Sequence, residues 1–578
     1  MTTGAHTGTR ERGTRIILAG YRAYRCRFAR ITARARRHFL AQDAEGMKAD
    51  AIERLDLYAK VVGRMAAALT RWQGEGLKDP TRWQRIKNAY ALEIEATPDR
   101  EIAETFFNSI TRRLFSTVGI DPALEFIDTP LPAPAPADSL VLRPTTLSRT
   151  PEDEVYHLLE HFSLHATPAD MERDARRIVA QLAKTICHPA DLAGTRIEMI
   201  AEPFFRDLGA YLVGHMQQPG HKPSAFVLAL RCKGGAPNVD ALLQEEKQVR
   251  ILFSYTRSHF FVTAQPPVAL VDFLRPLMPN KRIAELYISL GYHKHGKTEL
   301  YRELRAHLAV CGAEQFDFSP GQRGMVMIAF NMPSDDLVYK VIRDRFDRPK
   351  TASRNEVMAK YDFVFKHDRA GRLVDVQTFE DLTVDACCFT PRLLAEFETQ
   401  ATAAVDLKDE RVILRHVYVE RRVTPLDLFI RQRSGESRAV IDDYGRAIKD
   451  LARINVFPGD MLLKNFGVTR LGRVVFYDYD ELCPLTECNF RKLPPPRDEM
   501  ETLSAEPWFM VGENDVFPEE FRFFLGMPPD LKKRFLARHE ELLTPRFWRE
   551  VQVRIQAGEW IHIHPYDNKH RLKKPRPF

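Results

Sequence analysis

Apolar residues recur at helical spacing through most of the first 310 positions of the chain. In the first of these segments, the apolar positions at three- and four-residue steps are Ile17, Tyr21, Tyr24, Phe28 and Ile31. The same spacing returns in residues 51–72 and 101–115. Apolar positions three and four apart share one face of a helix, so each segment is predicted to be an amphipathic helix.

Further segments extend the helical pattern. The predicted helices span 152–165, 170–184, 268–277 and 282–290, and two apolar runs, 226–232 and 249–264, favour strands. Between them, residues 129–138 form a proline-rich stretch. We expect it to be a surface excursion within one domain, because helical patterns resume after it; a linker between domains is the alternative.

The pattern changes near residue 315. Short apolar runs at 326–331, 337–342 and 412–420 predict strands, while 354–369 and 440–454 predict helices. We therefore expect an α+β chain with two domains, a mainly helical domain at 1–314 and a mixed domain at 315–578.

Composition adds few constraints. The chain has 578 residues, 44% of them hydrophobic and 28% charged, with a net charge of +7, which is ordinary for a soluble globular protein and gives only a weak indication of nucleic acid. No apolar run is long enough to span a membrane, and the eight cysteines are scattered without zinc-finger spacing. We expect a cytoplasmic protein that binds neither membrane nor nucleic acid.

The N-terminal helix is strongly basic. Ten arginines lie between residues 10 and 37, against the single acidic residue Glu11. A transit peptide, an arm that binds nucleic acid or membrane, and a helix packed on the domain all fit this composition. The absence of serine weakens the transit peptide, and we expect the packed helix.

The segment 454–483 carries three groups suited to a nucleoside triphosphate. Asp460 is followed after five positions by Asn465, and Asn465 after thirteen by Asp478, at the end of a predicted hairpin. Protein kinases place a catalytic Asp and a metal-binding Asn at the first of these spacings. Carboxylate and amide oxygens suit Mg²⁺. Taken singly, each residue is better explained by a turn or a solvated surface; together they favour a phosphoryl-transfer site.

A glycine-containing loop and a lysine lie upstream. The loop has glycines at 321 and 324, and Lys340 lies inside the predicted apolar strand 337–342. A lysine in such a strand needs a partner unless it faces water. In a kinase its partners are nucleotide phosphates and a carboxylate. Three carboxylates remain open as that partner: Glu356, Asp375 and Glu380. The strand 412–420 occupies the sequence position of a kinase hinge.

A competing phosphate-binding motif occurs at 291–298. The sequence GYHKHGKT matches G-x-x-x-x-G-K-[ST], with Lys297 and Thr298 as its functional residues. However, the chain lacks the repeating βαβ pattern of a P-loop protein. A P-loop ATPase using Gly291–Thr298 stays an alternative, as does a pseudokinase that binds nucleotide without chemistry.

Long segments of the chain resemble the isocitrate dehydrogenase kinase/phosphatase family of bacteria. They are EIAETFFNSITRRLF (101–115), AELYISLGYHKHGKTELYRE (284–303), SPGQRGMVM (319–327), VYKVIRDRF (338–346), HDRAGRLVD (367–375), RHVYVERR (415–422), FPGDMLLKNFGVTR (457–470), GRVVFYDYDE (472–481) and DVFPEEFR (515–522). Together they are spread over most of the chain.

The resemblance implies a helical regulatory domain followed by a bilobal protein-kinase-like domain. It assigns ATP or ADP binding to Lys340 and to a loop whose residues are Ser319, Pro320, Gly321, Gln322, Arg323, Gly324 and Met325. It makes Asp460 catalytic, gives Mg²⁺ to Asn465 and Asp478, and assigns Asp375 to the active site in the phosphatase direction. It also implies NADP-dependent isocitrate dehydrogenase as the protein substrate and AMP as the allosteric effector, and a homodimer is among the expected assemblies.

The phosphatase activity has no motif of its own. The sequence has neither a C-x5-R nucleophile loop nor the His/Asp clusters of a binuclear metal phosphatase. We therefore expect the kinase site to perform both reactions, with a carboxylate such as Asp375 as base. The acidic and aromatic stretch 506–524 is expected to dock the partner, with a packed surface helix as the alternative. The basic tail 570–578 is expected to be disordered.

Overall fold

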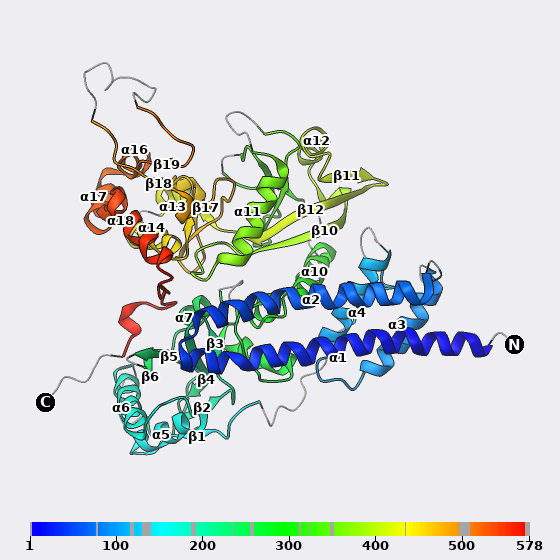
Figure 1. The fold of residues 1–578 in the computed structure, drawn as a ribbon, viewed down its shortest axis with the longest axis horizontal. Coiled ribbons are helices and arrows are strands. Elements are labelled where there is room, and N and C mark those ends of the chain that lie inside the picture. The colour runs from blue at the N-terminus through cyan, green and yellow to red at the C-terminus, as the bar shows by residue number, and fades with distance from the viewer. Residues whose placement is uncertain are drawn as a thin grey trace. The chain divides into compact units, whose positions relative to one another are not determined.

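The computed structural model describes residues 3–74, 76, 79–115, 121–129, 140–185, 192–233, 235–254, 259–310, 312, 314–321, 323–346, 352–433, 435–495 and 509–572. The chain forms two compact units (Figure 1). Unit 1 comprises Met1–Cys311 and His564–Phe578, and unit 2 comprises Gly312–Ile563.

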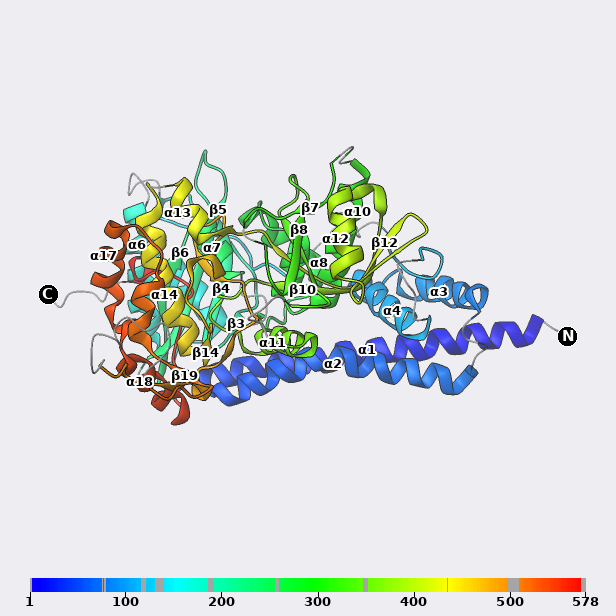
Figure 2. The same ribbon diagram turned by 90° about the horizontal axis from the view of Figure 1, so that it is seen from above.

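Unit 1 begins with two long helices that run side by side in both views (Figures 1 and 2), α1 (Thr3–Ala41) and α2 (Ala44–Gln73). The apolar residues of α1 used for its prediction are 0 to 3% exposed, which confirms the packed-helix interpretation. Asp43 ends the turn between the helices and caps α2 by accepting a hydrogen bond from the Gly46 amide at 2.8 Å.

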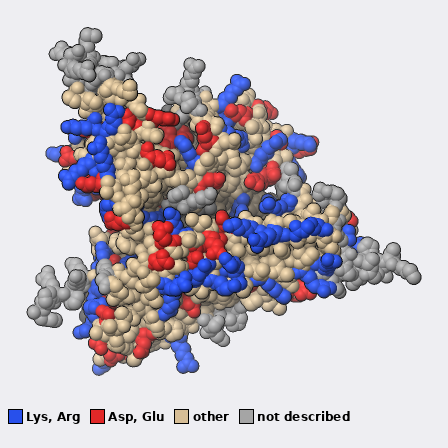
Figure 3. Space-filling model, viewed as in Figure 1, with Lys and Arg blue, Asp and Glu red and all other residues tan. Residues whose placement is uncertain are grey.

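The arginines of α1 lie mainly on its solvent side. Arg12, Arg15, Arg22, Arg30 and Arg37 are all exposed. Lys and Arg side chains gather along α1 and α2 on the face drawn in Figure 3. The basic character predicted from sequence therefore belongs to the outer face of a helix whose inner face is core.

The rest of unit 1 packs helices around one antiparallel sheet. The helices are α3 (Pro80–Ile94), α4 (Arg100–Phe115), α5 (Pro151–Phe162), α6 (Pro168–Thr185), α7 (Glu246–Leu252), α8 (Pro267–Leu274), α9 (Ile283–Ser289) and α10 (His293–Val310). The strands are β1 (Thr145–Thr146), β2 (Arg196–Met199), β3 (Phe204–Arg206), β4 (Gly209–Gln217), β5 (Ser224–Lys233) and β6 (Ala236–Leu243), in the order β1-β2-β4-β5-β6 with β3 on β4. The sheet is larger than the single strand predicted at 226–232.

The first part of the strand predicted at 249–264 is wrong; residues 255–258 lie outside the described residues, and Phe261 forms an isolated antiparallel bridge with Phe205. Residues 246–252 form α7, in which Val249 and Leu252 are buried three positions apart. The side chains of Glu245 and Gln248 complete a capping box at its start. A short apolar run does not distinguish a buried strand from a buried helix, and here the cap favours the helix.

The C-terminal segment returns to unit 1, whereas the sequence placed it in the second domain. The Leu572 amide donates to the Asp240 carbonyl of β6 at 2.8 Å, and Tyr566 and Arg571 both bond the Asp240 side chain, at 2.9 and 3.0 Å. The remainder of the predicted tail, 573–578, lies outside the described residues, as does most of the proline-rich stretch.

Unit 2 has two lobes. The first is a sheet with order β10-β12-β9-β8-β7 and β11 on β12. Its strands are β7 (Asp317–Phe318), β8 (Met327–Asn331), β9 (Leu337–Ile342), β10 (Val376–Asp385), β11 (Val405–Lys408) and β12 (Arg411–Arg421), and its helices are α11 (Arg354–His367) and α12 (Pro391–Gln400).

The second lobe is mainly helical. Its helices are α13 (Leu426–Gln432), α14 (Ser437–Arg453), α16 (Phe521–Phe524), α17 (Pro529–His539) and α18 (Pro545–Gln556), and short strands pair as β13 (Thr424–Pro425), β15 (Phe466–Val468) and β16 (Val474–Phe476), as β14 (Val456–Phe457) with β17 (Cys483–Pro484), and as β18 (Asn489–Phe490) with β19 (Asp515–Val516). The predicted α+β class is confirmed. No helix among the described residues is long and apolar enough to cross a membrane.

Candidate nucleotide and phosphoryl-transfer site

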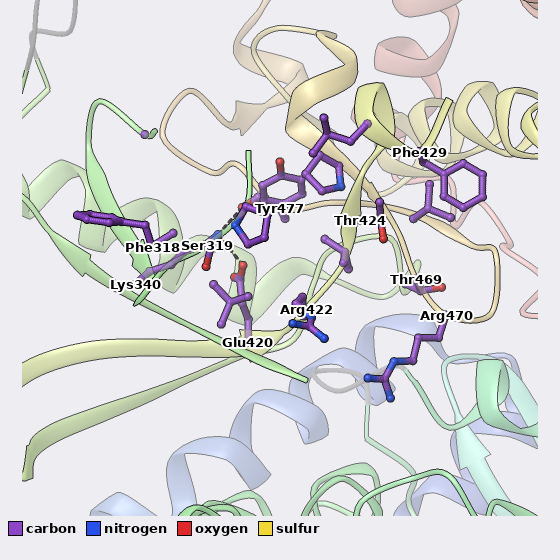
Figure 4. Close-up of a pocket in the computed structure, with 18 of the residues that line it drawn as sticks. Phe318, Ser319, Lys340, Glu420, Arg422, Thr424, Phe429, Thr469, Arg470 and Tyr477 are labelled. Carbon is purple, nitrogen blue, oxygen red and sulfur yellow. Dashed lines mark hydrogen bonds and ion pairs between the residues drawn. The ribbon is translucent and has the colours of Figure 1, made fainter. Parts of the chain in front are cut away.

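A cavity of about 580 Å³ opens in unit 2. Its wall comes from the loop 318–324, from β8 and β9, from the connection between β12 and α13, and from the hairpin β15–β16 (Figure 4). Ser319, Pro320, Arg323, Gly324 and Lys340, all predicted from sequence to bind nucleotide, line this cavity.

The glycine loop has a conformation that other residues would not adopt easily. Gly321 has a φ of 121°, and a Cβ on Gly324 would lie 2.9 Å from the Met327 carbonyl oxygen. Gly321 and Met325 belong to the loop but do not line this cavity, and Gln322 lies outside the described residues. The loop thus brings backbone close to the cavity, as phosphate binding requires.

Lys340 is held by a carboxylate that the sequence did not identify. Its Nζ lies 2.6 Å from Glu420 Oε1, and both side chains are buried, 9% and 3% exposed. Nζ also donates to the Tyr477 carbonyl at 3.2 Å. The pair forms because β9 and β12 are antiparallel neighbours with Lys340 opposite Tyr418. Glu420 then follows two residues along, on the same face.

The three carboxylates considered from sequence are engaged elsewhere or exposed. Glu356 caps its own helix by accepting a hydrogen bond from the Ser353 amide at 2.6 Å. Glu380 is exposed in the middle of the pairing between β10 and β12, opposite His416. Asp375 accepts hydrogen bonds from Gln377 Nε2 at 3.0 and 3.1 Å. The signal that points to Glu420 is an acidic residue that directly follows the apolar residues Val417, Tyr418 and Val419 near the end of β12.

The structure brings Asp460 and Asn465 into contact and pairs Asn465 with the residue that precedes Asp478. Asn465 Nδ2 donates to Asp460 Oδ1 at 2.5 Å, and the Leu462 amide donates to the same oxygen at 3.0 Å. The Tyr477 amide donates to the Asn465 carbonyl at 3.2 Å. This bond extends the β15–β16 pairing as far as Tyr477, and Asp478 is the next residue of the chain.

Asp375 lies on a different segment of the chain, which runs beside the segment that leads to Asp478. The Val374 amide donates to the Phe476 carbonyl at 3.1 Å, and Leu373 and Phe476 form a parallel bridge. Asp375 and Asp478 are each two residues beyond that bridge, on chain segments that run in the same direction. Asp375 also precedes Val376, which pairs with Glu420. The segment carrying Asp375 thus borders both the lysine pair and the strand that ends before Asp478.

A buried ion pair between Arg372 and Asp443 stabilises the segments that carry Asp375 and Asp478. Arg372 donates to both carboxylate oxygens of Asp443 on α14, at 2.8 and 3.0 Å, and to the Val474 carbonyl at 3.0 Å. Burial alone raises the pKa of Asp443, but the Arg372 guanidinium outweighs it and holds this pKa well below its usual range. Tyr444, the next residue of α14, donates to the Met461 carbonyl at 2.5 Å, beside Asp460.

The donor set fits a magnesium ion shared with phosphate. Within the described ranges, no group of three His, Cys, Asp or Glu side chains is gathered as a self-sufficient metal cluster. A kinase-type site needs none, because Mg²⁺ takes one or two protein oxygens and completes its coordination with phosphate oxygens and water. Asp478 and Asn465 provide oxygens of the required kind.

The motif at 291–298 is not a P-loop. The preceding residues form helix α9 rather than a strand, and Gly296, Lys297 and Thr298 lie inside α10. A Cβ on Gly296 would meet the Ala284 carbonyl at 2.5 Å, so this glycine permits close packing of two helices. The structure contradicts the P-loop ATPase.

Part of the predicted docking stretch 506–524 is described. Phe523 and Phe524 on α16 are 75% and 59% exposed, and Met510 is 87% exposed. The first three residues of the stretch lie outside the described residues. Docking stays a prediction.

Comparisons with known proteins match both units. The model of the isocitrate dehydrogenase kinase/phosphatase (AceK) regulatory domain matches residues 14–311, and that of the AceK kinase domain matches residues 314–568. An isocitrate dehydrogenase kinase/phosphatase of Anaeromyxobacter sp. (strain Fw109-5) is 45% identical over 566 residues, covering 97% of each chain. One of Xanthomonas euvesicatoria pv. vesicatoria (strain 85-10) is 38% identical over 569 residues, covering 97% of this chain and 98% of its own.

A solved kinase domain, ROP18 in complex with AMP-PNP and sucrose, covers 44% of this chain and 90% of its own. Its identity of 10% and TM-score of 0.20 are too low to support an inference.

Proposed function

The chain belongs to the isocitrate dehydrogenase kinase/phosphatase family, and from this premise we propose that it phosphorylates and dephosphorylates a serine of isocitrate dehydrogenase. Both reactions take place at one site that binds ATP or ADP with Mg²⁺. The proposal rests on one observation. Tyr477 connects the cavity that contains Lys340 to the group formed by Asp460, Asn465 and Asp478. Its carbonyl accepts from Lys340, its amide donates to Asn465, and it precedes Asp478.

In the kinase direction, each residue has a chemical role. Lys340, fixed by Glu420, binds the nucleotide phosphates under the loop 319–325. Asp460 accepts the hydrogen bond of the serine hydroxyl and orients it for attack. Asn465 and Asp478 are the residues that would hold Mg²⁺, which would supply positive charge next to the transferred phosphoryl group.

In the phosphatase direction, the attacking group is water. Asp375 accepts a proton from that water as the water oxygen bonds to phosphorus and the bond from phosphorus to the serine oxygen breaks, so that phosphate is released and the serine oxygen takes up a proton. Mg²⁺ and nucleotide would be bound at the same time. The support is the position of Asp375, on a segment that runs beside the strand leading to Asp478. AMP is the allosteric effector, and its binding shifts the balance from the kinase reaction toward the phosphatase reaction. The two opposing reactions together control flux between the tricarboxylic acid cycle and the glyoxylate bypass.

The test uses the purified chain, Mg²⁺, ATP labelled on the γ-phosphate, and NADP-dependent isocitrate dehydrogenase, with and without AMP. We expect label to enter the dehydrogenase and its amount to fall when AMP is added. ATP hydrolysis without labelled dehydrogenase would contradict the proposed substrate, and ATP binding without turnover would indicate a pseudokinase.

A further inference from the structure

Two thiols lie next to each other just beyond the segment that ends at Asp478. Cys483, in β17, and Cys488 are free thiols whose Sγ atoms are 3.6 Å apart. Cys483 is partly exposed, whereas Cys488 is buried in the core of unit 2. A disulfide bond is about 2.05 Å long, so its formation requires the two sulfur atoms to move about 1.5 Å closer to each other.

The turn between the two cysteines is fixed by hydrogen bonds. The Leu485 amide donates to the Asn455 carbonyl at 3.1 Å, and the Thr486 amide donates to Asn455 Oδ1 at 2.9 Å. From α18, Gln552 Nε2 donates to the carbonyls of Leu485 and Cys488, both at 2.8 Å. These contacts keep the two sulfur atoms close to each other, so little conformational entropy is lost when a bond forms between them.

Cys483 has the character of the reacting thiol of the pair. A hydrogen bond from the Cys488 thiol and the positive charge of Lys360 hold the pKa of Cys483 below its usual range, although burial opposes them. The thiolate form of a cysteine is its nucleophilic form. Because Cys483 is also the more exposed of the two, a small oxidant reaches it first, and Cys488 is placed to resolve the product.

We propose that Cys483 and Cys488 are a redox-active dithiol, which hydrogen peroxide converts into a disulfide that slows phosphoryl transfer. The Cys483 thiolate attacks one peroxide oxygen, the O–O bond breaks, and the hydroxide that leaves takes up a proton to form water. Cys483 is then a sulfenic acid. The Cys488 sulfur attacks the Cys483 sulfur, an S–S bond replaces the S–OH bond, and the displaced hydroxide leaves with the Cys488 proton as water. Two thiols are oxidised, and one peroxide is reduced to two water molecules.

The dithiol is connected to the segment that leads to Asp460. Cys483 pairs with Phe457 between β17 and β14. Two residues after Phe457, a Cβ on Gly459 would lie 2.5 Å from Glu481 Cβ and 2.7 Å from the Glu481 carbonyl oxygen, so the two backbones are tightly packed. Movement of Cys483 toward Cys488 therefore displaces backbone next to Asp460, and a misplacement of about 1 Å can cost a reaction about a hundredfold in rate. The effect on rate rests on the proposed function, whereas disulfide formation does not.

The experiment treats the reduced full chain with hydrogen peroxide, removes the peroxide with catalase, and maps the disulfides by mass spectrometry of peptides. The initial rate of phosphorylation of isocitrate dehydrogenase is measured before oxidation, after oxidation and after reduction with dithiothreitol. We expect a link between Cys483 and Cys488, a rate that is lower by about tenfold or more, and recovery of the rate on reduction.

Oxidation of Cys483 without the link would overturn the inference, as would a link that leaves the rate unchanged. No phosphorylation by the reduced chain would overturn the proposed function and with it the effect on rate. In that case the peptide map still decides whether the dithiol forms a disulfide, so the two failures are distinguishable.

The variant Cys488→Ala removes the resolving thiol and should keep the phosphorylation rate of the reduced wild type. After brief exposure to peroxide, it should retain most of that rate, because the link cannot form. Cys387→Ser is the matched control, since it removes an exposed thiol of the same unit and should respond to peroxide as the wild type does. A Cys488→Ala variant as sensitive to peroxide as the wild type would contradict the disulfide as the cause. If this variant does not fold, the peptide map and the recovered rate of the wild type decide the question.

Discussion

Lys340 and Glu420 meet across two neighbouring strands, with Nζ 2.6 Å from Oε1 and both side chains buried. In protein kinases, the corresponding lysine pairs with a carboxylate on a helix, and the position of that helix controls activity. Here the helix that follows β9 in sequence is α11, whose Glu356 serves as an N-terminal cap. The lysine is therefore fixed by the register of the sheet and does not depend on movement of α11.

Substitution of the two candidate phosphate-binding lysines should affect ATP binding differently. Lys340→Ala should weaken ATP binding roughly ten- to a hundredfold, because a charged hydrogen bond to phosphate contributes about 1.5–3 kcal/mol. Lys297→Ala should leave ATP affinity unchanged, because Lys297 lies within helix α10 of the other unit. Calorimetric titration with ATP and Mg²⁺ measures both. A loss confined to Lys297→Ala would contradict the assignment of the cavity.

Lys340→Ala also leaves Glu420 buried without its cation, which is expected to cost about 3–5 kcal/mol of stability. The double variant Lys340→Met with Glu420→Leu removes both charges and serves as the folding control. It should fold better than Lys340→Ala and bind ATP equally poorly.

Asp375→Asn should affect the two reactions unequally. General-base catalysis contributes about 10²- to 10⁴-fold, so dephosphorylation of phosphorylated isocitrate dehydrogenase should fall by that order, with phosphorylation reduced less than about tenfold. Single-turnover rates in both directions provide the measurement. Gln377→Ala, which removes the amide that donates to Asp375 at 3.0 Å but keeps the carboxylate, is the control. Equal loss of both reactions in Asp375→Asn would indicate a structural role.

Asp478→Asn should raise the Mg²⁺ concentration needed for half-maximal phosphorylation, because an amide is a weaker ligand than a carboxylate for a hard cation. Chelation of Mg²⁺ should abolish both reactions. Glu487→Gln, an exposed change nine residues further along the chain, should leave the Mg²⁺ dependence as it is. An unchanged Mg²⁺ titration in Asp478→Asn would remove this residue from the metal site.

Unit 1 contains a carboxyl group whose ionisation opposes folding. Burial raises the pKa of Glu101 to about 8, and Tyr287 donates to its Oε1 at 3.4 Å. In the unfolded chain Glu101 ionises near pH 4.5. Between pH 4.5 and 8 the folded state therefore binds the additional proton, and stability falls as pH rises, by at most about 1.4 kcal/mol per pH unit from this group.

Glu101→Gln should remove that part of the slope, so its stability relative to wild type should improve from pH 5 to pH 8. Urea unfolding at several pH values, followed by a probe in unit 1, measures this difference. The exposed Glu93→Gln is the control and should show no such trend. A difference between Glu101→Gln and wild type that is constant over this pH range would contradict the raised pKa.

The sequence was sufficient wherever local pattern determines structure. The helical spacing of Ile17 and Phe28 predicted α1, because both residues are core on one helix face. The spacing of Asp460 and Asn465 predicted a contact that one turn of chain can make. These features depend on few residues that are close in sequence.

The pairing of strands that are distant in the chain could not be predicted from the sequence. Glu420 meets Lys340 only because β12 pairs with β9 across eighty residues of chain, and no local spacing encodes that pairing. The residues 249–252 were assigned to a strand because a short apolar run has no decisive period. The match at 291–298 failed for a related reason, since the motif specifies residue types but not the strand that must precede them.

The central claim is that one site performs both reactions, and Asp460→Asn tests it most directly. Asp460 accepts hydrogen bonds from Asn465 and the Leu462 amide, so an amide of the same shape removes the charge with little change in volume. We predict that this variant binds ATP but loses at least about a hundredfold in both phosphorylation and nucleotide-dependent dephosphorylation of isocitrate dehydrogenase. Loss of phosphorylation with dephosphorylation at the wild-type rate would contradict a shared site.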